Sequence, residues 1–169
     1  IVDISHGVGG DLSYRKQASA GVLGDPLIPL GSTGEMAFDG AKATWQVVGY
    51  QVRQQLDSDD FEPPWTEYLL YSRSVGFAFL VASSEGWSWA VTLTGVPETS
   101  GDSASWQGVR YAKRYDDYGS RVAYVLGEFY WKVERDQQTR HADYASGPRR
   151  LNREQQGQEV TWSEGATMP

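Results

Sequence analysis

The stretch that decides the fold reads VLGEFYWKV and runs from Val125 to Val133. Aromatic and β-branched residues favour strands, in which successive side chains point to opposite faces. One face of this strand, extended back by two residues, carries only apolar residues: Ala123, Val125, Gly127, Phe129, Trp131 and Val133. We therefore expect this face to point into a hydrophobic core.

The opposite face of the same strand is mixed, with aromatic, aliphatic and charged side chains: Tyr124, Leu126, Glu128, Tyr130 and Lys132. Such a face is either half-buried under a loop or exposed for contact. Glu128 lies between two tyrosines, and two interpretations of it are open. It is hydrogen-bonded or paired with an arginine, as buried carboxylates commonly are, or it binds a ligand or takes part in catalysis.

The same two-residue alternation recurs along the chain. It predicts strands over residues 35–38, 44–52, 65–71, 75–81, 87–93, 139–144 and 159–163. Asp39-Gly40 is a typical hairpin turn, and Glu85-Gly86 turns the chain again. The pattern predicts a mostly β domain, an antiparallel meander that forms a small barrel or sandwich, with little helix.

Other segments are less regular. We expect residues 1–30 to be an N-terminal arm or linker, residues 95–105 to be a loop, and Leu151 to Gln156 to form one helical turn. The β domain is then predicted over residues 31–165. From their apolar faces, Phe77, Phe79, Trp87 and Trp89 are expected to share the core with Phe129 and Trp131.

Composition excludes several classes of site. The 169 residues suit one domain or two small ones, and none is a cysteine, which excludes disulfides, a thiol nucleophile and thiolate zinc sites. The net charge of −7 argues against non-specific nucleic-acid binding. No apolar run approaches the ~18 residues of a membrane-spanning helix. The lack of cysteine is compatible with a cytoplasmic location.

Catalytic and metal motifs are also missing from the sequence. It contains neither a phosphate-binding loop nor a Gly-x-Ser-x-Gly elbow. Its two histidines, His6 and His141, lack ligand spacing, so we expect them to face solvent and we expect neither a metal nor another cofactor. Carboxylates remain: Glu67, Glu128, Asp143, Glu154, Glu159 and Glu164. A pair of them about 5–9 Å apart would suit glycoside chemistry, but the sequence does not give that distance.

The motifs, taken in order, resemble the bacterial domain-of-unknown-function 4178 family over about residues 30–165. They are Leu30–Gly34, Val47–Gly49, Trp65–Leu70, Gly76–Val81, Gly86–Trp89, Val125–Trp131, Asp143-Tyr144 and Glu159–Gly165. The chain departs from the family pattern at Gly147-Pro148 and Leu151-Asn152, where the family tends toward Pro-Pro and Leu-Ser. The resemblance implies a bacterial, cytoplasmic accessory protein and carries no assigned activity.

Two functions are compatible with these observations. The first is a non-catalytic module that docks a protein partner through an aromatic and acidic face, with Glu67, Tyr124, Glu128, Tyr130 and Asp143 as binding residues. The second is a binder of a small cationic amine, or a carboxylate enzyme acting on one. A pocket that encloses Glu67 or Glu128 with two aromatic rings favours the second function, whereas a flat patch or a strand edge favours the first. The sequence determines neither the ligand nor the oligomeric state.

Overall fold

The computed structural model describes residues 13–18, 26–56, 63–130, 133 and 136–169, and these residues form strands without a helix. Within these ranges lie thirteen strands. They are β1 (Ser13–Ala18), β2 (Thr33–Phe38), β3 (Ala41–Gln55), β4 (Trp65–Ser72), β5 (Gly76–Ser83), β6 (Gly86–Thr92), β7 (Glu98–Ser100), β8 (Ser103–Trp106), β9 (Val109–Lys113), β10 (Tyr118–Phe129), β11 (Gln138–Ser146), β12 (Arg149–Gln156) and β13 (Glu159–Thr167). The prediction of a mostly β chain with little helix is confirmed.

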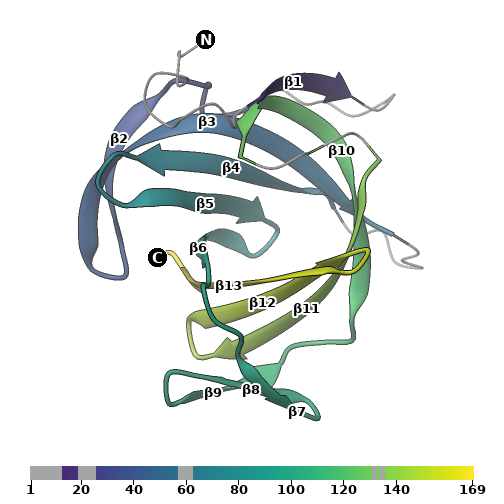
Figure 1. Ribbon diagram of the computed structural model, residues 1–169. Coiled ribbons are helices and arrows are strands. Elements are labelled where there is room, and N and C mark those ends of the chain that lie inside the picture. The colour runs from purple at the N-terminus through teal and green to yellow at the C-terminus, as the bar shows by residue number, and fades with distance from the viewer. Residues whose placement is uncertain (1–12, 19–25, 57–62, 131–132, 134–135) are drawn as a thin grey trace.

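Eight of the described strands close into a ring, so the fold is a barrel (Figure 1). The order around the ring is β10-β3-β4-β5-β6-β13-β12-β11, and β11 returns to β10 through four residue pairs between Tyr118–Arg121 and residues 138–141. Neighbouring strands are antiparallel throughout. β1 and β2 extend the sheet beside β10 and β3, and β7, β8 and β9 extend it beside β11.

The first hairpin turn forms as its sequence predicts. Asp39 and Gly40 have φ values of 53° and 78°, and β2 pairs with β3 from Phe38 and Ala41 outward. Positive φ at both central residues defines the tight turn whose twist matches that of a hairpin. The hairpin leads into the long strand β3, which also pairs with β10 and β4.

The inward face of the barrel is apolar at one end and polar at the other. A core cluster of six buried residues fills the apolar end: Val48, Leu69, Val122, Val125, Phe129 and Val133. Phe77 and Phe79 pack against this cluster, as predicted for these two rings. Further along β3 and β4 the same face carries Gln51, Arg53 and Glu67. The polar end is where a site can form.

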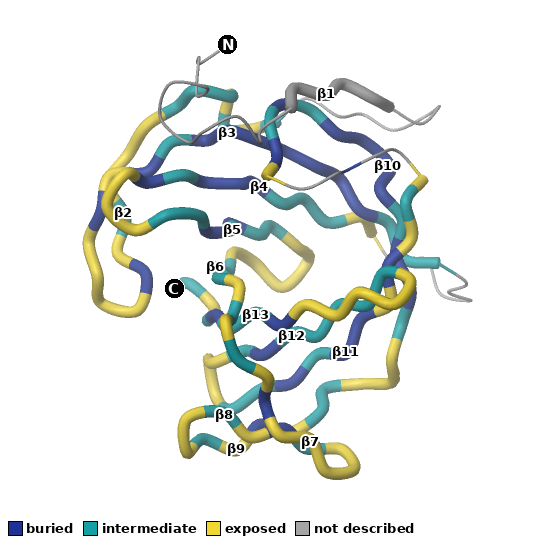
Figure 2. The backbone as a smooth tube through the Cα atoms, viewed as in Figure 1, coloured by how far each residue is buried: buried dark blue, intermediate teal, exposed yellow. Residues whose placement is uncertain are grey.

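Shorter elements cover the outer face of the barrel. The β2–β3 hairpin contributes Phe38 and Trp45 to a core that also holds Tyr68 and Leu80, and Ile28 and Leu30 pack against it. On the other side, β8 and β9 cover a third core, in which Tyr144 and Trp162 are buried. Figure 2 shows that burial is concentrated along β3, β4 and β10. These strands are buried on both faces, which leaves little room for an exposed contact face on them.

The prediction of one apolar and one mixed face on the decisive strand is wrong in part. A register irregularity between Val122 and Tyr124 on β10 brings Ala123 to the same outer core as Tyr124, while Val125 and Phe129 face inward. Tyr124 is 6% exposed, so it belongs to a core rather than to a contact face. Trp131 and Lys132 lie outside the described residues.

Three further expectations are corrected. Residues 151–156 are not a helical turn but part of β12, which pairs with β11 and β13. Turns at Gly147 and Gly157, with φ of 58° and 62°, make these segments hairpins, and local helical propensity is overridden by the two neighbouring strands. Residues 95–105 contain β7 and most of β8 rather than a loop alone. Trp87 is 36% exposed and is therefore not a core residue.

Candidate functional site

The polar end of the barrel encloses a cavity of about 970 Å³. Residues from all eight strands of the ring line it, which identifies it as the interior of the barrel rather than a surface groove. Trp65 on β4 and His141 on β11 place their ring centroids 5.8 Å apart although their strands are not neighbours. Side chains from opposite walls therefore meet in this space.

Acidic and aromatic side chains dominate the described lining of the cavity. Eight carboxylates line it: Glu67, Glu85, Asp116, Asp117, Asp143, Glu154, Glu159 and Glu164. Three arginines do so: Arg53, Arg114 and Arg150. Seven aromatic rings complete the walls: Trp65, Phe79, Trp87, Trp89, Tyr115, Tyr118 and Tyr130. The described walls are thus net negative and rich in π faces.

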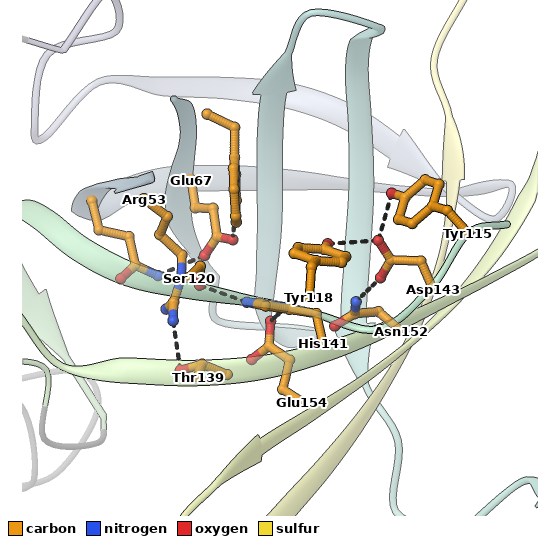
Figure 3. A network of polar contacts seen from close by, with 12 residues as sticks. Arg53, Glu67, Tyr115, Tyr118, Ser120, Thr139, His141, Asp143, Asn152 and Glu154 are labelled. Carbon is orange, nitrogen blue, oxygen red and sulfur yellow. Dashed lines mark hydrogen bonds and ion pairs between the residues drawn. The ribbon is translucent and has the colours of Figure 1, made fainter. Parts of the chain in front are cut away.

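A chain of polar contacts crosses the floor of the cavity (Figure 3). The buried Arg53 donates from Nε to Ser120 Oγ at 3.0 Å and from Nη2 to Thr139 Oγ1 at 2.6 Å. Ser120 Oγ lies 2.6 Å from His141 Nε2. On the other side of the ring, His141 Nδ1 lies 3.6 Å from Glu154 Oε1. The chain links β3, β10, β11 and β12.

Ser120, His141 and Glu154 are connected in the order of a serine triad, but they cannot work as one. A triad needs a hydroxyl that a substrate carbonyl can reach. Ser120 is 0% exposed, and its oxygen accepts a hydrogen bond from the Arg53 guanidinium. A buried hydroxyl held in this way connects its neighbours and attacks nothing.

His141 is buried in the neutral form. Burial, followed by the charges of Arg53 and Arg140, lowers the pKa of its imidazole to about 3. Because Arg53 can only donate to Ser120, the Ser120 hydroxyl is free to donate to His141 Nε2, which leaves the N–H on Nδ1 facing Glu154. His141 is 3% exposed, so the expectation that it faces solvent is wrong. His6 lies outside the described residues.

Two of the interior carboxylates are held by donors on both oxygens. Glu67 accepts from Trp65 Nε1 at 2.9 Å and from Gln51 Nε2 at 2.6 Å. Asp143 accepts from the hydroxyls of Tyr115 and Tyr118 at 2.7 and 2.6 Å, and from the Asn152 side-chain amide. Burial, followed by the charge of Asp143, raises the pKa of both tyrosines, so their hydroxyls remain donors.

Glu154 differs from these two carboxylates. Among the described residues its polar contact is His141 Nδ1, which at 3.6 Å lies beyond hydrogen-bonding distance. Burial inside the barrel raises the pKa of its carboxyl; Arg53 opposes this shift, the charges of Glu67 and Asp143 add to it, and the resulting pKa is about 7. Its side chain remains 36% exposed because the empty cavity reaches it. Glu154 is therefore both poorly neutralised and accessible.

The cavity brings together three of the five residues predicted as binding residues. Glu67, Tyr130 and Asp143 line it. Tyr124 is buried in the outer core, and Glu128, which pairs with β1 at Tyr14, is not part of the described lining. Glu67 and Glu128 thus do not share the cavity, and a binding role for any of the five stays a prediction.

Sequence reasoning missed two residues that organise the cavity, Arg53 and Tyr118. It placed His141 in solvent and named Glu154 only as one of six acids. A usable signal was present, since every second residue of three strands is polar. These sets are Gln51, Arg53 and Gln55; Thr139, His141 and Asp143; and Asn152, Glu154 and Gln156. A polar alternation opposite a buried face indicates a lined interior as well as a solvated one.

In the ranges that the structure covers, His, Asp and Glu side chains form no group of three that could hold a metal ion. The absence of a metal cofactor stays a prediction. No described segment is a helix long and apolar enough to cross a membrane.

One protein-family model matches most of the chain. The family model described as "Domain of unknown function (DUF4178)" matches residues 37–169. This confirms the resemblance found in the strand motifs. A search of curated proteins and a search of solved structures found no match.

Proposed function

The chain belongs to the DUF4178 family, whose description assigns no activity, and we propose from the cavity itself that the protein binds a small organic cation inside its barrel. Glu67 carries this proposal, because it is enclosed in a cavity together with Trp65 and the rings of Tyr118 and Trp87. A carboxylate surrounded by aromatic faces attracts a cation through charge and through the ring quadrupoles. A pocket of this size and mixed lining is also typical of small-molecule sites.

The balance of charge favours a cation over an anion. Arg114 is engaged by Glu85, with both carboxylate oxygens within 2.9 Å of its Nη2. The described hydrogen bonds of Arg53 go to two hydroxyls. Carboxylates outnumber these cations on the described walls, and a low-dielectric cavity strengthens the resulting field. An anionic ligand would meet repulsion from most sides.

Gln51 fixes the direction of the Glu67 carboxylate. Its amide nitrogen donates to Glu67, so its carbonyl oxygen must point away. That oxygen is buried and has no hydrogen-bond partner within the described structure, and Gln51 lines the cavity. Buried acceptors of this kind are usually satisfied. Because this oxygen has almost no accessible surface, it is not a contact for a ligand, and the role of Gln51 is to hold the Glu67 carboxylate in place.

Docking of a protein partner remains a second candidate because of the rings at the cavity's exposed parts. Trp87, Tyr115 and Tyr130 are partly exposed and line the cavity. A lysine or arginine of a partner could insert between them. Neither function requires catalysis, and a cytoplasmic location without nucleic-acid binding stays a prediction.

Thermal melts with spermidine test the proposal. A ligand at 100 times its Kd stabilises the folded state by about 2.7 kcal/mol, so we expect the melting temperature to rise by several degrees. Magnesium chloride at equal ionic strength controls for binding of cations to the acidic surface, and succinate controls for charge sign. An equal shift with magnesium, or no shift with spermidine, contradicts cavity binding.

A matched pair of variants locates the binding. Ser163 on β13 lines the cavity, whereas Ser105 on β8 is exposed outside the barrel. Ser163→Trp fills part of the cavity and should abolish the spermidine shift, while Ser105→Trp should leave it intact. Loss of the shift in both variants, or in neither, would place the binding outside the cavity.

A further inference from the structure

Resting on the proposed function, we propose that the bound cation takes the place of a proton on Glu154, so that binding to the protonated form releases that proton to solvent. The ligand class is then an ammonium ion that carries its own charge at neutral pH. A weak base would instead take up the proton of Glu154, and no proton would leave. Glu154 is then the residue that anchors the ligand, and binding depends on pH.

The hydrogen bonds of the three interior carboxylates identify the anchor. Glu67 and Asp143 each accept donors on both oxygens, which holds their charge in place. Glu154 makes no described contact within hydrogen-bonding distance, yet it lines the same cavity. It has acceptor capacity for an incoming N–H group.

The surroundings of Glu154 raise the pKa of its carboxyl, which favours the protonated form. Charged and titratable groups from several described elements lie near Glu154: Arg53 on β3, Glu67 on β4, Tyr130 after β10, and His141 and Asp143 on β11. On β13 its direct partner is Thr161, which does not titrate. Burial raises the pKa of Glu154 most; Arg53 lowers it, and the charges of Glu67 and Asp143 raise it further.

A cation that binds beside Glu154 displaces the proton of its carboxyl group. With a pKa of about 7, Glu154 is half protonated at neutral pH in the empty cavity. A cation beside it favours the carboxylate, so the pKa falls and the proton leaves for solvent. His141 does not capture this proton, because its own pKa is held at about 3. The carboxylic acid and the free cation become a carboxylate–cation pair and a solvated proton.

Calorimetry on the parent chain tests the exchange directly. Spermidine is titrated at pH 5.5, 6.5 and 7.5 in buffers of different ionisation enthalpy, and the slope of heat against that enthalpy counts the protons. For a group that titrates near 7, we expect close to one proton released at pH 5.5 and about a quarter at pH 7.5. Affinity should rise roughly 10- to 30-fold over the same range.

Two isosteric variants assign the proton. Glu154→Gln should bind spermidine only as weakly as the parent chain does at pH 5.5, without releasing a proton and with an affinity that does not change with pH. Glu98 on β7 is exposed outside the barrel, so Glu98→Gln removes the same charge and should behave like the parent chain.

The outcomes separate this inference from the proposed function. Binding without proton release in the parent chain, or release that persists in Glu154→Gln, overturns the exchange and leaves cation binding intact. Failure of spermidine to bind the parent chain at any of the three pH values overturns both.

Discussion

At the scale of single residues, Glu67 and Glu154 face one cavity and differ because of their neighbours. Glu67 is fixed by an indole and an amide donor, whereas Glu154 has a neutral imidazole 3.6 Å away. The first arrangement favours a permanent carboxylate. The second leaves a carboxyl whose charge depends on what else occupies the cavity.

Replacing Glu67 tests the first arrangement. Glu67→Gln puts an NH₂ group against one of two donors, Trp65 Nε1 or Gln51 Nε2, so that donor loses its acceptor. We expect the free energy of unfolding to fall by about 1–3 kcal/mol. Glu35→Gln, on the exposed β2 strand, removes the same charge and should change it by less than about 0.5 kcal/mol. Urea melts measure both, and equal effects would show that charge, not hydrogen bonding, decides.

Replacing Glu154 should have the opposite sign at alkaline pH. Its folded-state pKa of about 7 exceeds its ordinary value, so the folded state binds more protons than the unfolded state, and stability falls as pH rises from about 4.5 to 7. Glu154→Gln removes this loss. Allowing for water in the cavity, we expect the variant to be about 1 kcal/mol more stable than the parent at pH 8 and equal to it near pH 4. Denaturant melts at both pH values decide, and a less stable variant at pH 8 would contradict the raised pKa.

His141 should produce the acid limb of the stability profile. Its folded-state pKa of about 3 lies below its ordinary value, so the unfolded state binds the extra proton and stability falls as pH drops from about 6.5 toward 3. In His141→Gln this dependence should flatten. The comparison uses the slope of unfolding free energy against pH, because the lost contact with Ser120 lowers stability at every pH. An unchanged slope would show that another group carries the acid limb.

At the scale of elements, the sequence predicted strands well wherever one face of the strand was uniformly apolar. β4, β5, β6 and the β2–β3 hairpin follow their two-residue alternation and their Gly turns. β10 was harder to predict, because its irregularity between Val122 and Tyr124 changes which side chains face inward, and nothing in the alternation marks it. β12 was predicted as a helical turn because its alternate residues are polar; these side chains line the interior cavity instead of a solvated surface.

The seam between β6 and β13 depends on one close approach. A Cβ at Gly165 would lie 1.8 Å from the Trp89 carbonyl oxygen, a backbone atom that cannot move away alone. Gly165→Ala should therefore separate these strands and lower the free energy of unfolding by about 2 kcal/mol or more. Gly34 on β2 has no atom within 4 Å of such a Cβ, so Gly34→Ala is the matched control. Thermal melts compare the two, and equal losses would exclude a steric seam.

At the scale of the whole molecule, local patterns predicted the class but not the closure. The sequence left a barrel and a sandwich open, because the closing contact is only four residue pairs between β10 and β11. The interior site depends on that closure, and its walls come from strands that are far apart in sequence, such as β3 and β11. Arg53 and Thr139 lie 86 positions apart in the sequence, yet Arg53 Nη2 is 2.6 Å from Thr139 Oγ1. No local pattern gives such a distance.

The placement of the N-terminal boundary near residue 30 is also a question about the whole molecule. β1 lies beside β10 at an edge of the sheet, outside the closed ring. Residues 26–31 are different. The backbone N–H of Leu27 donates to the Tyr68 hydroxyl at 3.0 Å, and Ile28 and Leu30 pack on the outer core. The boundary that matters for stability is therefore expected to lie before Pro26.

Two truncations test this boundary. A chain that starts at Pro26 loses one edge strand and keeps the ring of eight, so we expect a strand-type circular-dichroism spectrum and a melting temperature within a few degrees of the parent. A chain that starts at Thr33 also uncovers the outer core and should lose about 3 kcal/mol, because two aliphatic side chains no longer cover it. Equal stability of the two truncated chains would show that residues 26–32 do not hold the barrel. A large loss in the first would show instead that β1 is needed to protect β10.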